Sequence, residues 1–86
     1  MKSSTTPDFW ACCRALPPEI RSRARVAFRM WRTNARHPSL CFKKVGEAWS
    51  VRIGSGYRAL ALVQGDTFFW FWMGTHHEYE RLISEM

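Results

Sequence analysis

The feature of the sequence that most limits the fold is an apolar run near its end, TFFWFWM, at residues 67–73. The run is far too short to cross a bilayer, which takes about 20 residues in a helix. It follows a predicted turn at Gly65 and Asp66 and is the length of a β-strand. Because it is apolar at every position, both of its faces must be covered, which predicts a central place in a sheet.

Two helices are predicted before the strands. The first begins with Thr6 as N-cap and Pro7 at the first helical position, and it ends at Pro17. The second carries an apolar stripe at helical spacing, formed by Ile20, Ala24, Ala27, Phe28 and Trp31. The connection between them is short, so we expect an antiparallel hairpin that covers one face of the sheet. Residues 1–5 are predicted to be a flexible terminus.

From Leu40 the apolar pattern changes from helical to alternating. It predicts strands at residues 40–45, 49–53 and 57–64 in addition to the apolar run. Gly54 and Gly56 allow a tight reversal between the second and third of these, because glycine accepts positive φ. The expected fold is α+β: a two-helix hairpin packed on a four-stranded, mainly antiparallel sheet. With 86 residues there is room for one core, so we expect a single domain over residues 1–86.

A capping box follows the apolar run, with Thr75 at the N-cap and Glu78 three residues later. It predicts a short C-terminal helix whose inward residues are Tyr79, Leu82 and Ile83. His76 then lies in the first turn, where the helix macrodipole disfavours a positive charge by about 0.3 to 1 kcal/mol. This favours the neutral imidazole near neutral pH, and a neutral imidazole can accept a proton.

The formal net charge of +6 is concentrated in residues 17–44. Residues 21–36 contain six arginines and no lysine. Such a field attracts polyanions, namely nucleic acid, an anionic membrane surface or an acidic protein. Guanidinium groups also favour bidentate partners, either phosphate or carboxylate. The alternative is that these arginines form only a solvated helix face.

The three cysteines, Cys12, Cys13 and Cys41, are odd in number, and no secretory leader precedes them. We therefore expect reduced thiols in a cytoplasmic protein. Adjacent cysteines lack metal-ligand spacing, so no metal site is predicted, and Cys13 is interpreted as a small hydrophobic residue of the core.

One group of residues has the composition of a catalytic site. If the last two strands pair and the C-terminal helix starts at the end of the sheet, Arg52, Arg58, His76 and Tyr79 approach one another on a concave surface. Cleavage of a phosphodiester by an RNA 2′-hydroxyl needs a base, a proton donor and positive charge, and it needs no metal or cofactor. The alternative is structural: a histidine in a helix cap, a partly buried tyrosine and an ordinary strand arginine.

Three stretches resemble the RelE/ParE superfamily of type II toxins, particularly its RelE-like and HigB-like members. They are HPSLCFKKV, WSVRIGSGYRAL and WFWMGTHHEYERLI, and the likeness extends over residues 8–84. Within that superfamily, RelE-like members are ribosome-dependent mRNA endonucleases, whereas ParE-like members inhibit DNA gyrase without that active site. The first strand usual in RelE-like folds is not evident in this sequence.

The resemblance implies roles for single residues. Arg58 matches the arginine that stabilises phosphate, Arg52 falls near a basic position, and His76 matches a catalytic position at the start of the final helix. Tyr79 is expected to assist as a proton donor or to stack on a base, while His77 has no assigned role. The residues expected to bind RNA are Lys43, Lys44, Arg29, Arg32 and Arg36.

The expected function is an mRNA endonuclease that inhibits translation. The alternatives left open are a gyrase inhibitor that cleaves nothing and an inactive member that only binds. In each case the expected partner is an acidic antitoxin encoded nearby, docked across the sheet or the helical hairpin.

Overall fold

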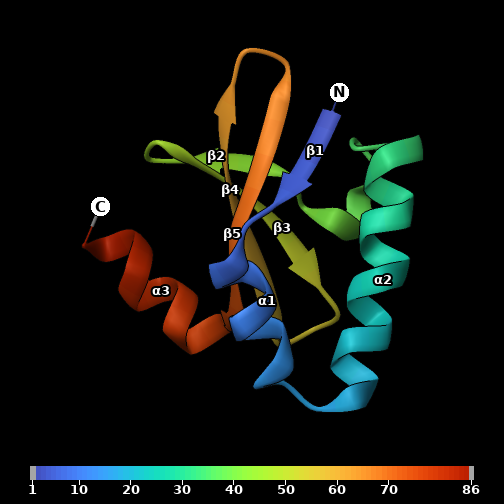
Figure 1. Cartoon of the computed structure of the whole chain (residues 1–86), viewed down its shortest axis with the longest axis vertical. Helices are drawn as coiled ribbons and strands as arrows, with labels where there is room; N and C mark the ends of the chain where they lie inside the picture. The colour runs from blue at the N-terminus through green and yellow to red at the C-terminus, as the bar shows by residue number, and fades with distance from the viewer. Residues whose placement is uncertain (1, 86) are drawn as a thin grey trace.

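A five-stranded sheet divides the molecule into two layers of helices (Figure 1). The structure is a computed structural model, and it describes residues 2–85. The elements in chain order are β1 (Lys2–Thr5), α1 (Pro7–Arg14), α2 (Pro18–Thr33), the 3-10 turn η1 (Pro38–Leu40), β2 (Lys43–Val45), β3 (Ala48–Ile53), β4 (Tyr57–Gln64), β5 (Thr67–Thr75) and α3 (His76–Ser84).

The apolar run forms the inner strand that its composition predicts. The strand order is β1-β5-β4-β3-β2, so β5 has a neighbour on each side. The core divides by face, because Ala59 and Ala61 pack with α1 and α2, whereas Leu60 between them packs with α3. The predicted α+β class is confirmed, and each face of the sheet has its own helical cover.

A β-bulge in β5 decides which aromatic residues reach which face. The register with β4 shifts so that Leu60 opposes Trp72 and Ala61 opposes Trp70, leaving Phe71 as the extra residue. Before the bulge, Trp70 faces α1 and α2, and after it Phe71 and Trp72 both pack on the α3 side. A bulge of this kind breaks the strict alternation of a strand.

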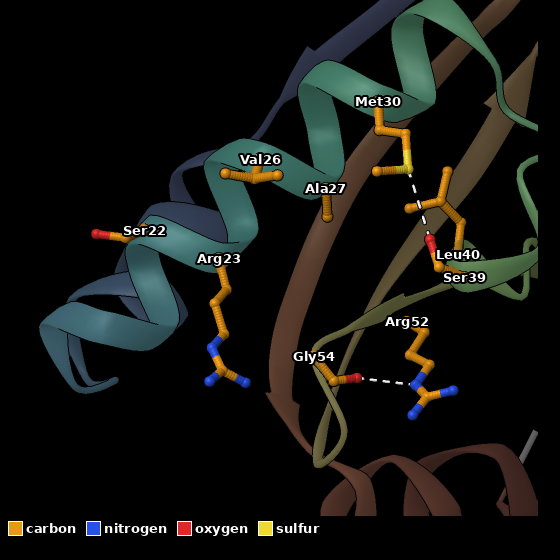
Figure 2. A pocket seen from close by; sticks show the side chains of 9 residues that line it. All are labelled: Ser22, Arg23, Val26, Ala27, Met30, Ser39, Leu40, Arg52 and Gly54. Carbon is orange, nitrogen blue, oxygen red and sulfur yellow. Dashed lines mark hydrogen bonds between the residues drawn. The ribbon is translucent and has the colours of Figure 1, made fainter.

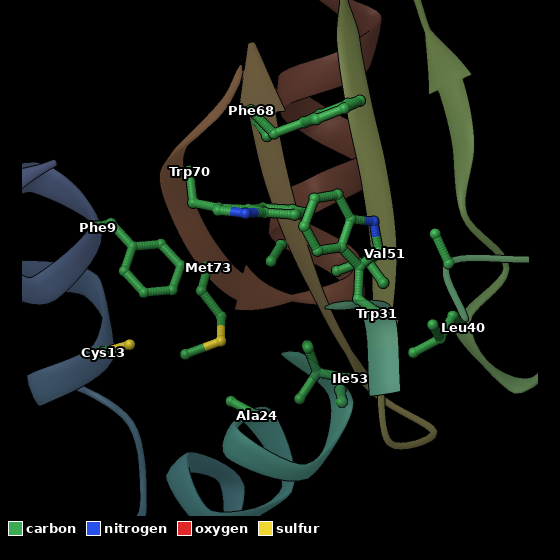
Figure 3. Packing of buried hydrophobic residues seen from close by; sticks show 14 residues of the cluster. Phe9, Cys13, Ala24, Trp31, Leu40, Val51, Ile53, Phe68, Trp70 and Met73 are labelled. Atoms are coloured by element: carbon green, nitrogen blue, oxygen red, sulfur yellow. The ribbon is translucent and has the colours of Figure 1, made fainter. Parts of the chain in front are cut away.

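Trp31 is the centre of the larger core (Figure 3). Its side chain is 1% exposed and makes edge-to-face contacts with Phe42, Phe68 and Trp70. Aromatic pairs in this geometry stabilise a core beyond the apolar area that they bury. A chain this short gains much of its core from a few large side chains.

The helix starts predicted from capping residues are confirmed. The Thr6 side chain accepts a hydrogen bond from the backbone N–H of Phe9. Thr75 and Glu78 form the complete capping box at the start of α3. Within residues 2–85, no helix combines the length and the apolar character needed to cross a membrane.

Two predictions about strands were wrong. Residues 1–5 were expected to be flexible, yet Lys2–Thr5 form β1, which pairs in parallel with β5; Met1 lies outside the described residues. All four of its side chains are exposed, so β1 is held mainly by backbone hydrogen bonds to the open edge of β5. The sheet therefore has five strands rather than four. The fifth is the first strand that the sequence did not reveal.

The predicted strand at residues 40–45 is also shorter than expected. Pro38 begins a 3-10 turn, and Cys41 takes a left-handed conformation with φ of 46°. Strand geometry therefore starts only at Lys43. The alternation of apolar residues in this stretch reflects packing of Leu40 and Phe42 against the core instead of a continuous strand.

Candidate active site

Arg52 and Arg58 lie directly opposite each other where β3 and β4 meet their connecting turn. They share the sheet face that α3 covers, because Leu60, two residues beyond Arg58 on the same strand, packs on that side. Arg52 Nε donates to the Gly54 carbonyl and Arg58 Nη1 donates to the Tyr57 carbonyl, both at 2.9 Å. Each guanidinium is thus tied to the turn and keeps other N–H groups free for a ligand.

The sequence of the turn explains why α3 begins beside these arginines. Gly54 has a positive φ of 62°, which closes the reversal. On the other side of β4, Gly74 opposes Arg58 and Thr75 opposes Tyr57. The backbone N–H of His76 then donates to the Gly56 carbonyl at 2.9 Å, which fixes the first residue of α3 to the turn.

Tyr79 links the histidine to the nearer arginine. The His76 and Tyr79 rings are stacked, with centroids 5.7 Å apart and planes inclined by 29°. The guanidinium carbon of Arg58 lies 5.8 Å from the centre of the Tyr79 ring, within cation–π range. Tyr79 is only 4% exposed, so its ring has little surface left to stack on an RNA base.

The structure brings three of the four residues that the sequence suggested for catalysis into contact, because Arg58 and His76 both contact Tyr79. Arg52 is paired with Arg58 in the ladder, but its side chain lines a hollow beside α2. The roles assigned to them in chemistry stay predictions.

Sequence reasoning missed Glu80. His76 Nε2 lies 2.7 Å from Glu80 Oε1, and both side chains are partly exposed to solvent. The signal was available in the sequence, because residues four apart on a helix are neighbours. His76 Nδ1 is buried and has no hydrogen-bond partner.

The arginines have no carboxylate partner within residues 2–85. Among residues 2–85, the ion pairs join Lys2 to Asp66 and His76 to Glu80, and none involves any of the ten arginines. Two like charges directly opposite each other in a sheet are destabilising. The unpaired guanidinium groups of Arg52 and Arg58 are therefore suited to an anion supplied from outside the chain.

The residues expected to bind RNA do not form one surface. Lys43 opposes Ser50 and lies on the α3 side of the sheet, whereas Lys44 opposes Trp49 and lies on the other side. Arg29 and Arg32 are exposed on α2, across the sheet from His76. Arg36 is exposed just after α2. Of this set, Lys43 alone shares the face of the catalytic candidates.

Two hollows lie on the α2 side of the sheet. One, of about 500 Å³, is bounded by α2, the segment around Leu40 and the end of β3. Figure 2 shows Arg23 and Arg52 approaching Gly54 from its two sides. β2 pairs only with residues 48–50, so the Arg52 side chain is free to reach around this open edge.

The second hollow, of about 530 Å³, lies between α2 and the layer formed by β1 and α1. Its floor is aromatic and includes Phe9, Phe28 and Trp70. Its remaining lining is rich in cations, contributed by Arg14, Arg21, Arg25, Arg29 and Arg32.

Comparison with known proteins agrees with this architecture. The sequence profile of the family described as ParE-like toxin domain matches residues 18–81. The toxin–antitoxin complex RelB–RelE from Methanococcus jannaschii contains a similar structure, with a TM-score of 0.70 and 20% identity, over 91% of this chain and 95% of that chain. No protein of curated function matches the sequence significantly.

Two further toxins have the same fold. YafQ from E. coli strain BL21(DE3) has a TM-score of 0.73 and 5% identity, over 91% of this chain and 96% of that chain. The YoeB/ParE toxin from Agrobacterium tumefaciens has a TM-score of 0.68 and 15% identity, over 88% of this chain and 99% of that chain. The chain belongs to the ParE-like toxin domain family, and it has the fold of the RelE, YafQ and YoeB/ParE toxins.

Proposed function

We propose that this toxin is an endoribonuclease that cleaves mRNA on the ribosome and thereby stops translation. The observation that carries the proposal is that Tyr79 contacts both Arg58 and His76 at one end of the sheet, where Arg58 is paired with Arg52 in the ladder. Two guanidinium groups without carboxylate partners offer bidentate hydrogen bonds to a phosphate. The imidazole of His76, stacked on Tyr79, adds a side chain that can take part in proton transfer.

The proposed reaction is an internal transfer within the RNA. The ribose 2′-oxygen attacks the adjacent phosphorus, and the bond from phosphorus to the 5′-oxygen of the next nucleotide breaks. Arg52 and Arg58 stabilise the charge that builds up on the phosphorane. His76 is one of the residues that take part in moving the proton. Because the nucleophile is part of the substrate, the reaction needs neither a metal nor a cofactor.

The RNA strand is proposed to run along the α3 side of the sheet. Lys43 is exposed on that side and offers a contact to the RNA backbone. Lys44, exposed on the same edge strand, offers a second contact from the other side. Contacts of this kind release counterions and make binding depend on salt concentration.

The groove between α1 and α2 is proposed to hold an acidic antitoxin. Its aromatic floor offers apolar area, and its arginines offer charge complementary to acidic side chains. The similar RelE structure from Methanococcus jannaschii is itself a complex with an antitoxin. This assignment places Arg29 and Arg32 against the protein partner and leaves the face of His76 to the RNA.

The test is a cell-free translation reaction with purified protein. The wild-type chain should stop protein synthesis and cut the message, while His76→Ala and Arg58→Ala should each lower the cleavage rate by about 100-fold or more. His77→Ala is the matched control, because His77 is exposed and adjacent to His76 but outside the cluster. Thermal unfolding of each variant shows whether the fold is retained. Full translation in the presence of the wild-type chain would contradict the proposal.

The second candidate function is inhibition of DNA gyrase without cleavage of nucleic acid. It is favoured by the matched family, whose description is ParE-like. A supercoiling assay separates the two functions, because a non-catalytic inhibitor keeps its activity when His76 is replaced by alanine. An endoribonuclease leaves supercoiling unchanged.

A further inference from the structure

The contact between His76 and Glu80 decides which atom of the site can take a proton from a ligand. His76 Nε2 faces Glu80 Oε1 at 2.7 Å, and the two side chains are 44% and 63% exposed. A carboxylate only accepts hydrogen bonds, so Nε2 must carry a hydrogen in this arrangement. The histidine nitrogen nearer to solvent is therefore a donor.

The other ring nitrogen does not reach the surface. His76 Nδ1 is buried and has no hydrogen-bond partner. In a relay where a carboxylate holds the imidazole from behind, the far nitrogen faces the substrate and accepts its proton. In this structure the arrangement is the opposite. The carboxylate of Glu80 contacts Nε2 on the solvent-exposed side of the ring, and Nδ1 on the other side is buried. An imidazole held in this way offers no free lone pair to an RNA hydroxyl.

Glu80, in contrast, offers a free lone pair to an RNA hydroxyl. Its Oε1 atom is engaged by His76, and the carboxylate as a whole is well exposed, so its second oxygen is open to a ligand. The backbone bond from His76 to Gly56 and the stacking on Tyr79 hold the imidazole in place. The imidazole in turn holds the carboxylate, which reduces the side-chain freedom that Glu80 must lose when it acts.

We propose that Glu80 is the general base of this site and that His76 is its positioning residue, an assignment that rests on the proposed endoribonuclease function. The O–H bond of the 2′-hydroxyl breaks and its proton moves to the free carboxylate oxygen of Glu80. The 2′-oxygen forms its bond to phosphorus, and the released 5′-oxygen takes a proton from solvent water. Glu80 then returns its proton to water.

The test compares two isosteric changes, one within α3 and one at its C-cap. Glu80→Gln keeps an oxygen that accepts from His76 Nε2 but cannot take a proton, so cleavage should fall by about 100-fold or more while the unfolding temperature stays unchanged. Glu85→Gln is the control, because Glu85 is an exposed carboxylate near the end of α3 and outside the cluster. It should cleave at the wild-type rate.

A second measurement separates a catalytic role from a structural one. Glu80→Ala opens space for a small carboxylate, so formate or acetate added to the reaction should restore part of the lost rate, which chloride at equal ionic strength should not do. Cleavage by Glu80→Gln at the wild-type rate, or Glu80→Ala that formate does not rescue, would overturn the assignment and leave the proposed function standing. A wild-type chain that cleaves no message in the same reaction would overturn both.

Discussion

The charges of Arg52 and Arg58 are not explained by the stability of the fold. Each guanidinium is tied to a backbone carbonyl at the same turn, and the two residues are paired across β3 and β4. Opposed like charges cost stability in a sheet, and no carboxylate of residues 2–85 pairs with either one. Binding of a phosphate removes this repulsion, so the resting site favours an anionic ligand.

Cys13 provides a test of the core at the scale of one residue. Burial raises the pKa of its thiol, the neighbouring Cys12 raises it further, and Arg21 and Arg14 oppose the shift. The thiolate is the reactive form, so at about pH 8 iodoacetamide should modify the exposed Cys41 well before Cys13. Mass spectrometry of the native chain against time measures both rates.

The sign of the same shift predicts a loss of stability in alkali. Because the folded pKa of Cys13 lies above its unfolded value, its contribution to stability is present below the unfolded pKa and is lost as the pH rises through the folded one. Cys13→Ala should lack this step. Alkylation of Cys13 as fast as Cys41 in the native chain would contradict the buried position.

At the scale of elements, the capping box fixes the start of α3 and so sets the position of His76, its first residue. The Thr75 hydroxyl oxygen accepts from the Glu78 N–H at 3.2 Å, and Glu78 Oε1 accepts from the Thr75 N–H at 3.2 Å. Thr75→Ala should lower the free energy of unfolding by about 1 kcal/mol, and Thr75→Ser should retain most of it. Urea titration measures the difference, and equal stability of both variants would argue against the cap.

Elements specified by neighbouring residues were predictable, and elements specified by distant ones were not. The starts of α1 and α3 follow from Thr6 and Thr75, each of which bonds to the N–H three residues later. β1 has no such signal, since its formation depends on the open edge of β5 more than sixty residues away. The bulge at Phe71 likewise depends on pairing with β4 and is not visible in an unbroken apolar run.

At the scale of the whole molecule, two cationic regions lie on opposite sides of the sheet, although they are continuous in the sequence. The arginines of α2 appeared continuous with Lys43 and Arg52 because they share one basic stretch of chain. Strand alternation places Lys43 on the α3 side, while α2 packs on the other, and the Arg52 side chain reaches around the open edge to the hollow beside α2. Which arginines share a face depends on register and sheet order, and neither can be read from composition.

The same geometry explains why the positions of the candidate residues could be anticipated while Glu80 was missed. The four candidates lie within a few positions of one turn and one helix start, so pairing of β3, β4 and β5 places their backbones near one another. The role of Glu80 depends on which face of the His76 ring is buried. That is a property of the packed molecule alone.

Analysis of the fragment ends is the most direct test of the central claim that this cluster breaks RNA by internal attack. Message cut by the wild-type chain in the cell-free translation reaction should carry a 2′,3′-cyclic phosphate or its hydrolysed 3′-phosphate on one fragment and a 5′-hydroxyl on the other. Arg58→Ala should give almost none of these ends. Fragments with 5′-phosphate ends, or a message left intact by the wild-type chain, would contradict the account.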